Sequence, residues 1–115
     1  MTKPWGHELI WAETPRYVGK ILHIKAGEQL SLQYHNRKDE TIMVLHGRLR
    51  FEHAEGSNPL TATELGPQQP FHIQSGLRHR MIALVDTDVV EVSTPELDDV
   101  VRLEDRYGRT GTSKP

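Results

Sequence analysis

Short stretches in which apolar and polar residues alternate recur along the chain, and turn residues separate them. Eight such stretches predict strands, at residues 17–25, 29–34, 40–45, 48–53, 60–65, 71–73, 79–85 and 88–94. Glycine, proline, asparagine and aspartate fill the turns between them, as in the segment GSNP at 56–59. Short strands at regular spacing are typical of all-β sandwiches and barrels, so we expect a compact antiparallel β-barrel.

The end of the chain departs from this pattern. The segment that begins at Pro95 is the one stretch in which a helix is possible, and a frayed tail is expected from Tyr107 onward, about residues 110–115 in particular. No internal repeat, linker or low-complexity segment interrupts the 115 residues. A chain of this length can form one hydrophobic core, so a single domain over residues 1–115 is predicted.

Composition excludes several classes of function. The chain has no cysteine, which rules out disulfides, thiolate metal sites and a cysteine nucleophile, and suits a reducing compartment. No stretch approaches the ~20 apolar residues that a membrane span needs, so a cytoplasmic protein is expected. The net charge is −2 with no basic face, so nucleic acid is not an expected partner.

Four residues together form a candidate metal site. Gln33 and His35 are two apart on a predicted strand, so both side chains face the same way. Glu40 opens the next strand after a short polar connection, and His79 begins a later one. Two imidazoles, a carboxylate and an amide oxygen suit one divalent transition metal, and the donor set is compatible with zinc, nickel, iron(II), manganese and cobalt alike. The remaining positions on the ion would hold water or a substrate.

The spacing of these residues resembles the sequence motifs of the cupin superfamily. The first motif is matched by Gly27, Gln33, His35, Glu40 and Gly47, with glutamine in place of the usual first histidine. Residues 76–79, with the sequence GLRH, resemble the second motif, although Gln74 stands where a proline is usual. The resemblance implies a small single-domain cupin, which is an antiparallel β-barrel of the jelly-roll type.

Within the cupins, the chain is most similar to the cupin domain of mannose-6-phosphate isomerases. Three segments carry the likeness, at residues 3–6, 27–35 and 97–109. This resemblance implies a metal-dependent isomerase or epimerase that acts on a sugar or sugar phosphate. The chain departs from the isomerase pattern at residues 41–42, which are Thr-Ile instead of His-Trp, and at Ser93, where glutamine is frequent.

The implied reaction moves a proton between adjacent carbons, so it needs a general base, and its substrate needs cationic partners for the phosphate. Spacing selects none of the candidates. Those for the base are Lys20, His23, Glu91 and Asp99. Those for the phosphate are Arg37, Arg78, Arg80, Arg102 and Arg109.

Two other functions stay open, because one fold hosts many chemistries. An iron(II)-type oxygenase or other metalloenzyme on a small organic substrate would suit a pocket with an apolar wall, which is expected from Ile42, Val44, Met81 and Ala83. A non-catalytic, metal-dependent binding or accessory module, for example of a polyketide or sugar pathway, is the other. The expected partners are a small molecule and a second copy of the chain, because outward apolar residues would favour a homodimer. The residues expected to face outward are Leu22, Ile24, Leu30 and Leu32.

Overall fold

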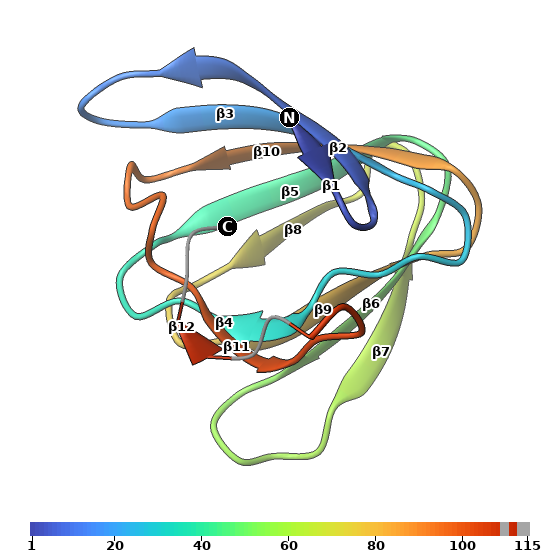
Figure 1. The fold of residues 1–115 in the computed structure, drawn as a ribbon. Coiled ribbons are helices and arrows are strands. Elements are labelled where there is room, and N and C mark those ends of the chain that lie inside the picture. Colours follow the sequence, from blue (N-terminus) through green and yellow to red (C-terminus); the bar gives the residue numbers. More distant parts are fainter. Residues whose placement is uncertain (109–110, 113–115) are drawn as a thin grey trace.

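The structure is a computed structural model that describes residues 1–108 and 111–112 of the chain. All regular elements in these residues are strands, and they form two antiparallel sheets of six strands each. Figure 1 shows the two sheets facing each other, so the chain forms the expected β-barrel. None of the described residues belongs to a helix that could cross a membrane.

The strand order within each sheet mixes distant parts of the chain. The first sheet has the order β1 (Thr2–Lys3), β2 (Gly6–Glu13), β3 (Val18–Ile24), β10 (Thr87–Ser93), β5 (Glu40–His46), β8 (Pro70–Ile73). The second has the order β12 (Gly111–Thr112), β11 (Val101–Glu104), β4 (Leu32–Tyr34), β9 (Arg78–Ala83), β6 (Leu49–Ala54), β7 (Thr61–Leu65). The crossovers place β4, β5 and β9, which carry the candidate ligands, around one interior.

The core lies between the two sheets and is built from the alternate residues that face inward. Phe51 on β6, Ile73 on β8 and Val89 on β10 have no exposed surface. The same inward rows also contain charged residues, among them Lys20 on β3 and Glu91 on β10, which are at most 5% exposed. The interior is therefore apolar in one part and densely charged in another.

The strand β2 was not predicted, and its burial is the reverse of the usual pattern. Glu8 is buried, whereas Leu9 and Trp11 are more than half exposed. The register also shifts at a bulge between Ile10 and Ala12, where β2 pairs with β3. Residues 9–12 are apolar in succession, so together with the register shift they break the period-two alternation by which a strand is recognised.

Two expectations for the end of the chain are wrong. The described residues after Pro95 contain no helix, since the chain passes through turns there and enters β11. Residues 111–112, expected in a frayed tail, form β12 and pair with β11. Tyr107, where the tail was expected to begin, packs against the core and donates a 2.8 Å hydrogen bond to Glu28. Residues 109, 110 and 113–115 lie outside the described residues.

The four leucine and isoleucine residues that were expected to face outward do not form an apolar surface. Leu22 and Ile24 belong to the core, and Leu30 packs against it. Leu32 is only 4% exposed. Strand β3 has an inward row at even positions, the reverse of the assumed orientation, so a homodimer cannot rest on these residues.

Candidate metal centre

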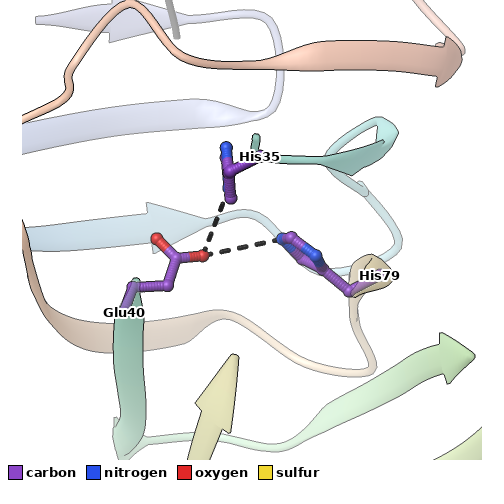
Figure 2. Close-up of side chains that lie close together, drawn as sticks. All are labelled: His35, Glu40 and His79. Carbon is purple, nitrogen blue, oxygen red and sulfur yellow. Dashed lines mark ion pairs between the residues drawn. The ribbon is translucent and has the colours of Figure 1, made fainter. Parts of the chain in front are cut away.

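Three of the four predicted ligands meet inside the barrel, as Figure 2 shows. His35 follows β4, Glu40 is the first residue of β5, and His79 is near the start of β9. The Nε2 atoms of His35 and His79 lie 3.5 and 3.6 Å from the same oxygen, Oε1 of Glu40. One ligand atom from each residue falls within 4.8 Å of the others, and all three side chains are buried.

The hydrogen bonds of both imidazoles leave an Nε2 lone pair facing inward. The Nδ1 atom of His35 lies 2.5 Å from the backbone oxygen of Asp99, and that of His79 lies 2.9 Å from the backbone oxygen of Leu77. A carbonyl oxygen only accepts, so each Nδ1 carries the hydrogen and donates it. Neither Nε2 has a hydrogen-bond partner among the described residues. Burial lowers the pKa of His79 to about 4, which keeps this imidazole neutral, as a metal ligand must be.

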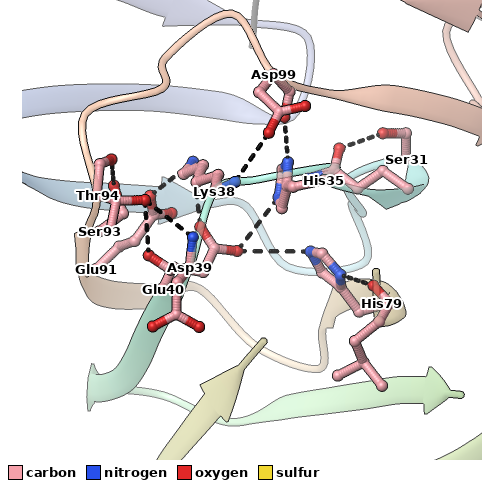
Figure 3. A network of polar contacts seen from close by, with 12 residues as sticks. Ser31, His35, Lys38, Asp39, Glu40, His79, Glu91, Ser93, Thr94 and Asp99 are labelled. Atoms are coloured by element: carbon pink, nitrogen blue, oxygen red, sulfur yellow. Dashed lines mark hydrogen bonds and ion pairs between the residues drawn. The ribbon is translucent and has the colours of Figure 1, made fainter. Parts of the chain in front are cut away.

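Asp99, one of the candidate bases, has a positioning role. Its carboxylate accepts hydrogen bonds from the backbone N–H groups of residues 36–38, at 3.0, 2.6 and 2.8 Å. Burial alone would raise the pKa of Asp99, but these three bonds outweigh it and the pKa is lowered. Figure 3 shows how the side chain holds the connection between His35 and Glu40, so that both ligands converge.

Lys38 is a buried residue of the site that the sequence did not reveal. Its Nζ atom lies 3.1 Å from Oε2 of Glu40 and 3.2 Å from Oε2 of Glu91 (Figure 3). Burial alone would lower the pKa of Lys38, but the two carboxylates hold it above its usual range. A lysine in a short polar connection is normally solvated, and the one available signal was its place two residues before Glu40.

The two carboxylates beside Lys38 differ in their protonation. Burial would raise the pKa of Glu40, but the His35 imidazole and the Lys38 ammonium outweigh it and hold the pKa well below its usual range. Glu40 is therefore charged and able to bind a cation. Burial, with a contribution from the negative charge of Glu40, raises the pKa of Glu91 to about 7.

Gln33, the fourth predicted ligand, lines the same cavity as His35 and Glu40. It pairs in register with His79 across β4 and β9, and its Oε1 accepts a 2.6 Å hydrogen bond from the hydroxyl of Ser31. An amide oxygen has a second lone pair, so this bond is compatible with metal binding. The cavity has a volume of about 40 Å³, which is enough for an ion and a few waters.

Ten of the residues that line this cavity are polar or charged, and four are apolar. The polar or charged ones are Lys3, Glu8, Lys20, Ser31, Gln33, His35, Lys38, Glu40, Glu91 and Arg102. The apolar ones are Trp5, Leu22, Leu30 and Met81. Ile42, Val44 and Ala83, which were expected on the pocket wall, pack in the core instead. The expected apolar wall is therefore wrong except at Met81.

Two of the candidate bases lie in the cavity and two do not. Glu91 and Lys20 line it. The His23 ring faces the outer side of β3, where its Nδ1 lies 2.7 Å from a carboxylate oxygen of Asp88. Asp99 acts on the backbone of the connecting loop, as described above.

Among the candidate arginines, Arg102 lines the cavity and is 4% exposed. Arg78 donates to backbone oxygens of Gly56 and Asn58 on the outside of the barrel. Arg80 forms ion pairs with Glu52 and Glu104. Arg37 is exposed, and Arg109 lies outside the described residues.

Two facing antiparallel sheets that enclose a His, Glu and His cluster define a cupin of the jelly-roll type, and solved structures agree. A cupin superfamily protein from Desulfitobacterium hafniense matches with a TM-score of 0.64 and 12% identity, over 76% of this chain and 75% of that one. KdgF from Halomonas sp. matches with a TM-score of 0.71 and 24% identity, over 81% and 82% of the two chains. At these identities the likeness establishes the fold.

The particular family follows from the sequence match. Residues 1–105 match the family described as mannose-6-phosphate isomerase C-terminal, and the chain belongs to it. Mannose-1-phosphate guanylyltransferase ManC of Salmonella typhimurium is 36% identical over 112 residues, which are 93% of this chain and 22% of that protein. The chain thus spans less than a quarter of the length of this relative. The resemblance seen in the sequence motifs is confirmed.

Proposed function

We propose that the cavity binds one divalent transition metal ion through His35, Glu40 and His79, with Gln33 as a fourth ligand, and isomerises or epimerises a sugar phosphate. The observation that carries the proposal is the pair of buried Nε2 atoms that converge on the Glu40 carboxylate without hydrogen-bond partners among the described residues. Buried nitrogens are rarely left unsatisfied, and a metal ion would satisfy both.

Glu91 is the general base in this proposal. The reaction requires a group that takes a proton from the carbon beside the carbonyl and returns it to the neighbouring carbon. Glu91 lies on the cavity wall, and burial raises its pKa to about 7, which suits proton transfer near neutral pH. A divalent ion held by the ligands would polarise the carbonyl and hydroxyl oxygens of the substrate. Lys20 lies 3.6 Å from the Glu8 carboxylate, a contact that favours its role as a cation.

The charges of the cavity favour an anionic substrate. Four cationic side chains and three carboxylates line it, so a bound divalent ion makes the site strongly positive. Lys3, Lys20 and Arg102 line the same cavity, and they would bind the phosphate group. The apolar residues Trp5 and Met81 are left to contact the carbon skeleton of the sugar.

A second candidate is a metal-dependent binding or accessory module without turnover. The small volume of the cavity, about 40 Å³, favours this candidate, because a sugar phosphate would fit only if the cavity walls opened. An oxygenase is less favoured, since it was supported by an expected apolar pocket wall, and three of the four residues expected there pack in the core instead. A cytoplasmic location and the exclusion of nucleic acid stay predictions from the sequence.

Two measurements test the proposal. Elemental analysis after dialysis against each candidate metal should find one ion per chain, and His79→Ala should lose it, while His72→Ala, at an exposed histidine bonded to Asp39, should keep it. Incubation of the metal-loaded chain with mannose 6-phosphate in D₂O should then place deuterium beside the carbonyl carbon, as detected by NMR.

The exchange assay also separates the two candidates. Glu91→Gln should abolish deuterium incorporation with the metal retained, and Glu52→Gln, on the outside of the barrel, should leave it intact. Binding of the sugar phosphate by the metal-loaded chain without any deuterium exchange would reject the isomerase and favour the binding module. Full metal retention in His79→Ala would reject the metal centre itself.

A further inference from the structure

A row of charged side chains crosses the inner face of the first sheet, one strand after another. In the order of the strands its members are Lys3 (β1), Glu8 (β2), Lys20 (β3), Glu91 (β10) and Glu40 (β5), with Lys38 between the last two. All of them line the cavity. Their charges alternate in sign along the row, so each buried charge has an opposite one beside it.

Glu8 is the carboxylate of this row that no step described above uses, and its contacts are loose. Its two oxygens lie 3.7 Å from Nζ of Lys3 and 3.6 Å from Nζ of Lys20. By comparison, Lys38 lies 3.1 Å from the Glu40 carboxylate. Hydrogen bonds between nitrogen and oxygen span about 2.7–3.2 Å, so neither Lys3 nor Lys20 makes one to Glu8. A carboxylate that is only 6% exposed is therefore able to accept hydrogen bonds from a molecule in the cavity.

Glu8 also lies at a defined distance from the reacting end of the cavity. It is two strands from Glu91 and three from Glu40, and strands about 4.8 Å apart place it roughly 10 Å from the base. Lys3 is one strand further. A hexose 6-phosphate with its carbons 1 and 2 at the ion would extend along this row and bring its phosphate to Lys3 and Lys20.

We propose that Glu8 is a specificity-determining residue that accepts a hydrogen bond from the carbon-4 hydroxyl of the sugar, the hydroxyl nearest the phosphate in the ring form. This inference rests on the proposed function. A carboxylate accepts hydrogen bonds and donates none, so it attracts a hydroxyl and repels a phosphate dianion. Glu8 thus favours a phosphorylated sugar over phosphate alone, and specificity of this kind is a difference between two affinities.

The part of the wall next to Glu8 is also the part that can open to admit such a ligand. Lys3 belongs to β1 and Trp5 to the turn after it, and both line the cavity. Strand β1 lies at the edge of the first sheet (Figure 1) and pairs with β2 through two residue pairs. The other strands of the row are paired on both sides, so displacing β1 breaks the fewest ladder hydrogen bonds.

The variant Glu8→Gln tests the proposal through a ratio of two affinities. Equilibrium dialysis of the metal-loaded chain measures binding of 1,5-anhydromannitol 6-phosphate, a ring analogue that cannot isomerise, and of inorganic phosphate. In Glu8→Gln the affinity for the analogue, relative to that for phosphate, should fall roughly tenfold or more, because the charged acceptor is lost. The matched control, Glu52→Gln on the outside of the barrel, should leave the ratio unchanged. A loss or gain by the same factor for both ligands would overturn the proposal, since a structural role or a simple change of charge has that effect.

A second measurement uses the native chain and does not depend on the folding of Glu8→Gln. The 4-deoxy form of the analogue should bind roughly tenfold more weakly than the analogue itself, and equal affinities would overturn the proposal. The deuterium exchange assay separates this inference from the proposed function. The expected affinities without any exchange would reject the isomerase and keep Glu8 as a sugar contact. Exchange with an unchanged ratio would reject the role of Glu8 alone, and a native chain that binds neither ligand would reject both.

Discussion

Replacing Lys38 by methionine removes the ammonium group that lies between two buried carboxylates. The Nζ atom is 3.1 Å from Glu40 and 3.2 Å from Glu91, and all three side chains are at most 6% exposed. Methionine keeps the length and apolar bulk of the side chain, so charge is the main change. Removing one partner of a buried ion pair costs about 3–5 kcal/mol. We expect the low end, about 3 kcal/mol, because Glu91, whose pKa burial already raises to about 7, can take up a proton.

Urea unfolding of the metal-free protein near neutral pH, followed by circular dichroism, measures this loss of unfolding free energy. The matched control is Arg50→Met. Its Nε atom also lies 3.1 Å from a carboxylate, that of Glu52, but the arginine side chain is 53% exposed. Exposed pairs contribute about 0–1 kcal/mol, so the control should change stability by no more than that.

A double variant tests the cause of the effect. Adding Glu91→Gln to Lys38→Met removes the like charge that faces Glu40, so part of the lost stability should return. A Lys38→Met protein as stable as the parent would refute the reasoning, and so would a double variant less stable than the single one. In either case the charge of Lys38 would not be what holds the two carboxylates in the interior.

Two further outcomes concern single side chains. Gln33→His should keep or tighten metal binding, measured by calorimetry, and lower deuterium exchange, because imidazole is the stronger donor and leaves a weaker Lewis acid. Loss of metal binding would mean that Gln33 does not face the ion. Burial alone would raise the pKa of Glu52, but Arg80 and Arg50 outweigh burial and lower it. The charged Glu52 side chain therefore stabilises the fold above about pH 4.5, and this stabilisation is lost as the pH falls further. Glu52→Gln should therefore flatten the acid side of a melting-temperature series, and an unchanged slope would contradict this.

Local sequence patterns predicted the strands with regular alternation, and they failed where the alternation was interrupted. The strand predicted at residues 40–45 was recognised because two of its three inward residues, Ile42 and Val44, are apolar. Strand β2 was missed because the consecutive apolar residues 9–12 break its alternation, and its direction is reversed, with Glu8 inside and Leu9 outside. That reversal has a physical origin in two demands on the strand, a charged cavity on one side and an apolar surface on the other.

The residues of the site also fall into those that the sequence could reveal and those that it could not. His35, Glu40 and His79 could be found from spacing, because strand geometry fixes which side chains share a face. Lys38 could not, because its role depends on Glu91, which is 53 positions further along the chain and meets it only through the pairing of β10 with β5. His23 was a candidate base for the same reason, since its inward or outward direction depended on a register that the sequence leaves open.

The two backbone carbonyls that hold the imidazoles affect how the site tolerates mutation. Because the acceptors at Leu77 and Asp99 belong to the main chain, replacing either side chain does not remove the hydrogen bond that orients its histidine. Position 77 is then constrained by packing in the core and position 99 by its loop contacts. A one-residue insertion or deletion in residues 95–99 would instead move the carbonyl itself. In a saturation library the site should therefore accept apolar substitutions at position 77 that keep the core packed, and reject almost every change of length between Pro95 and Asp99.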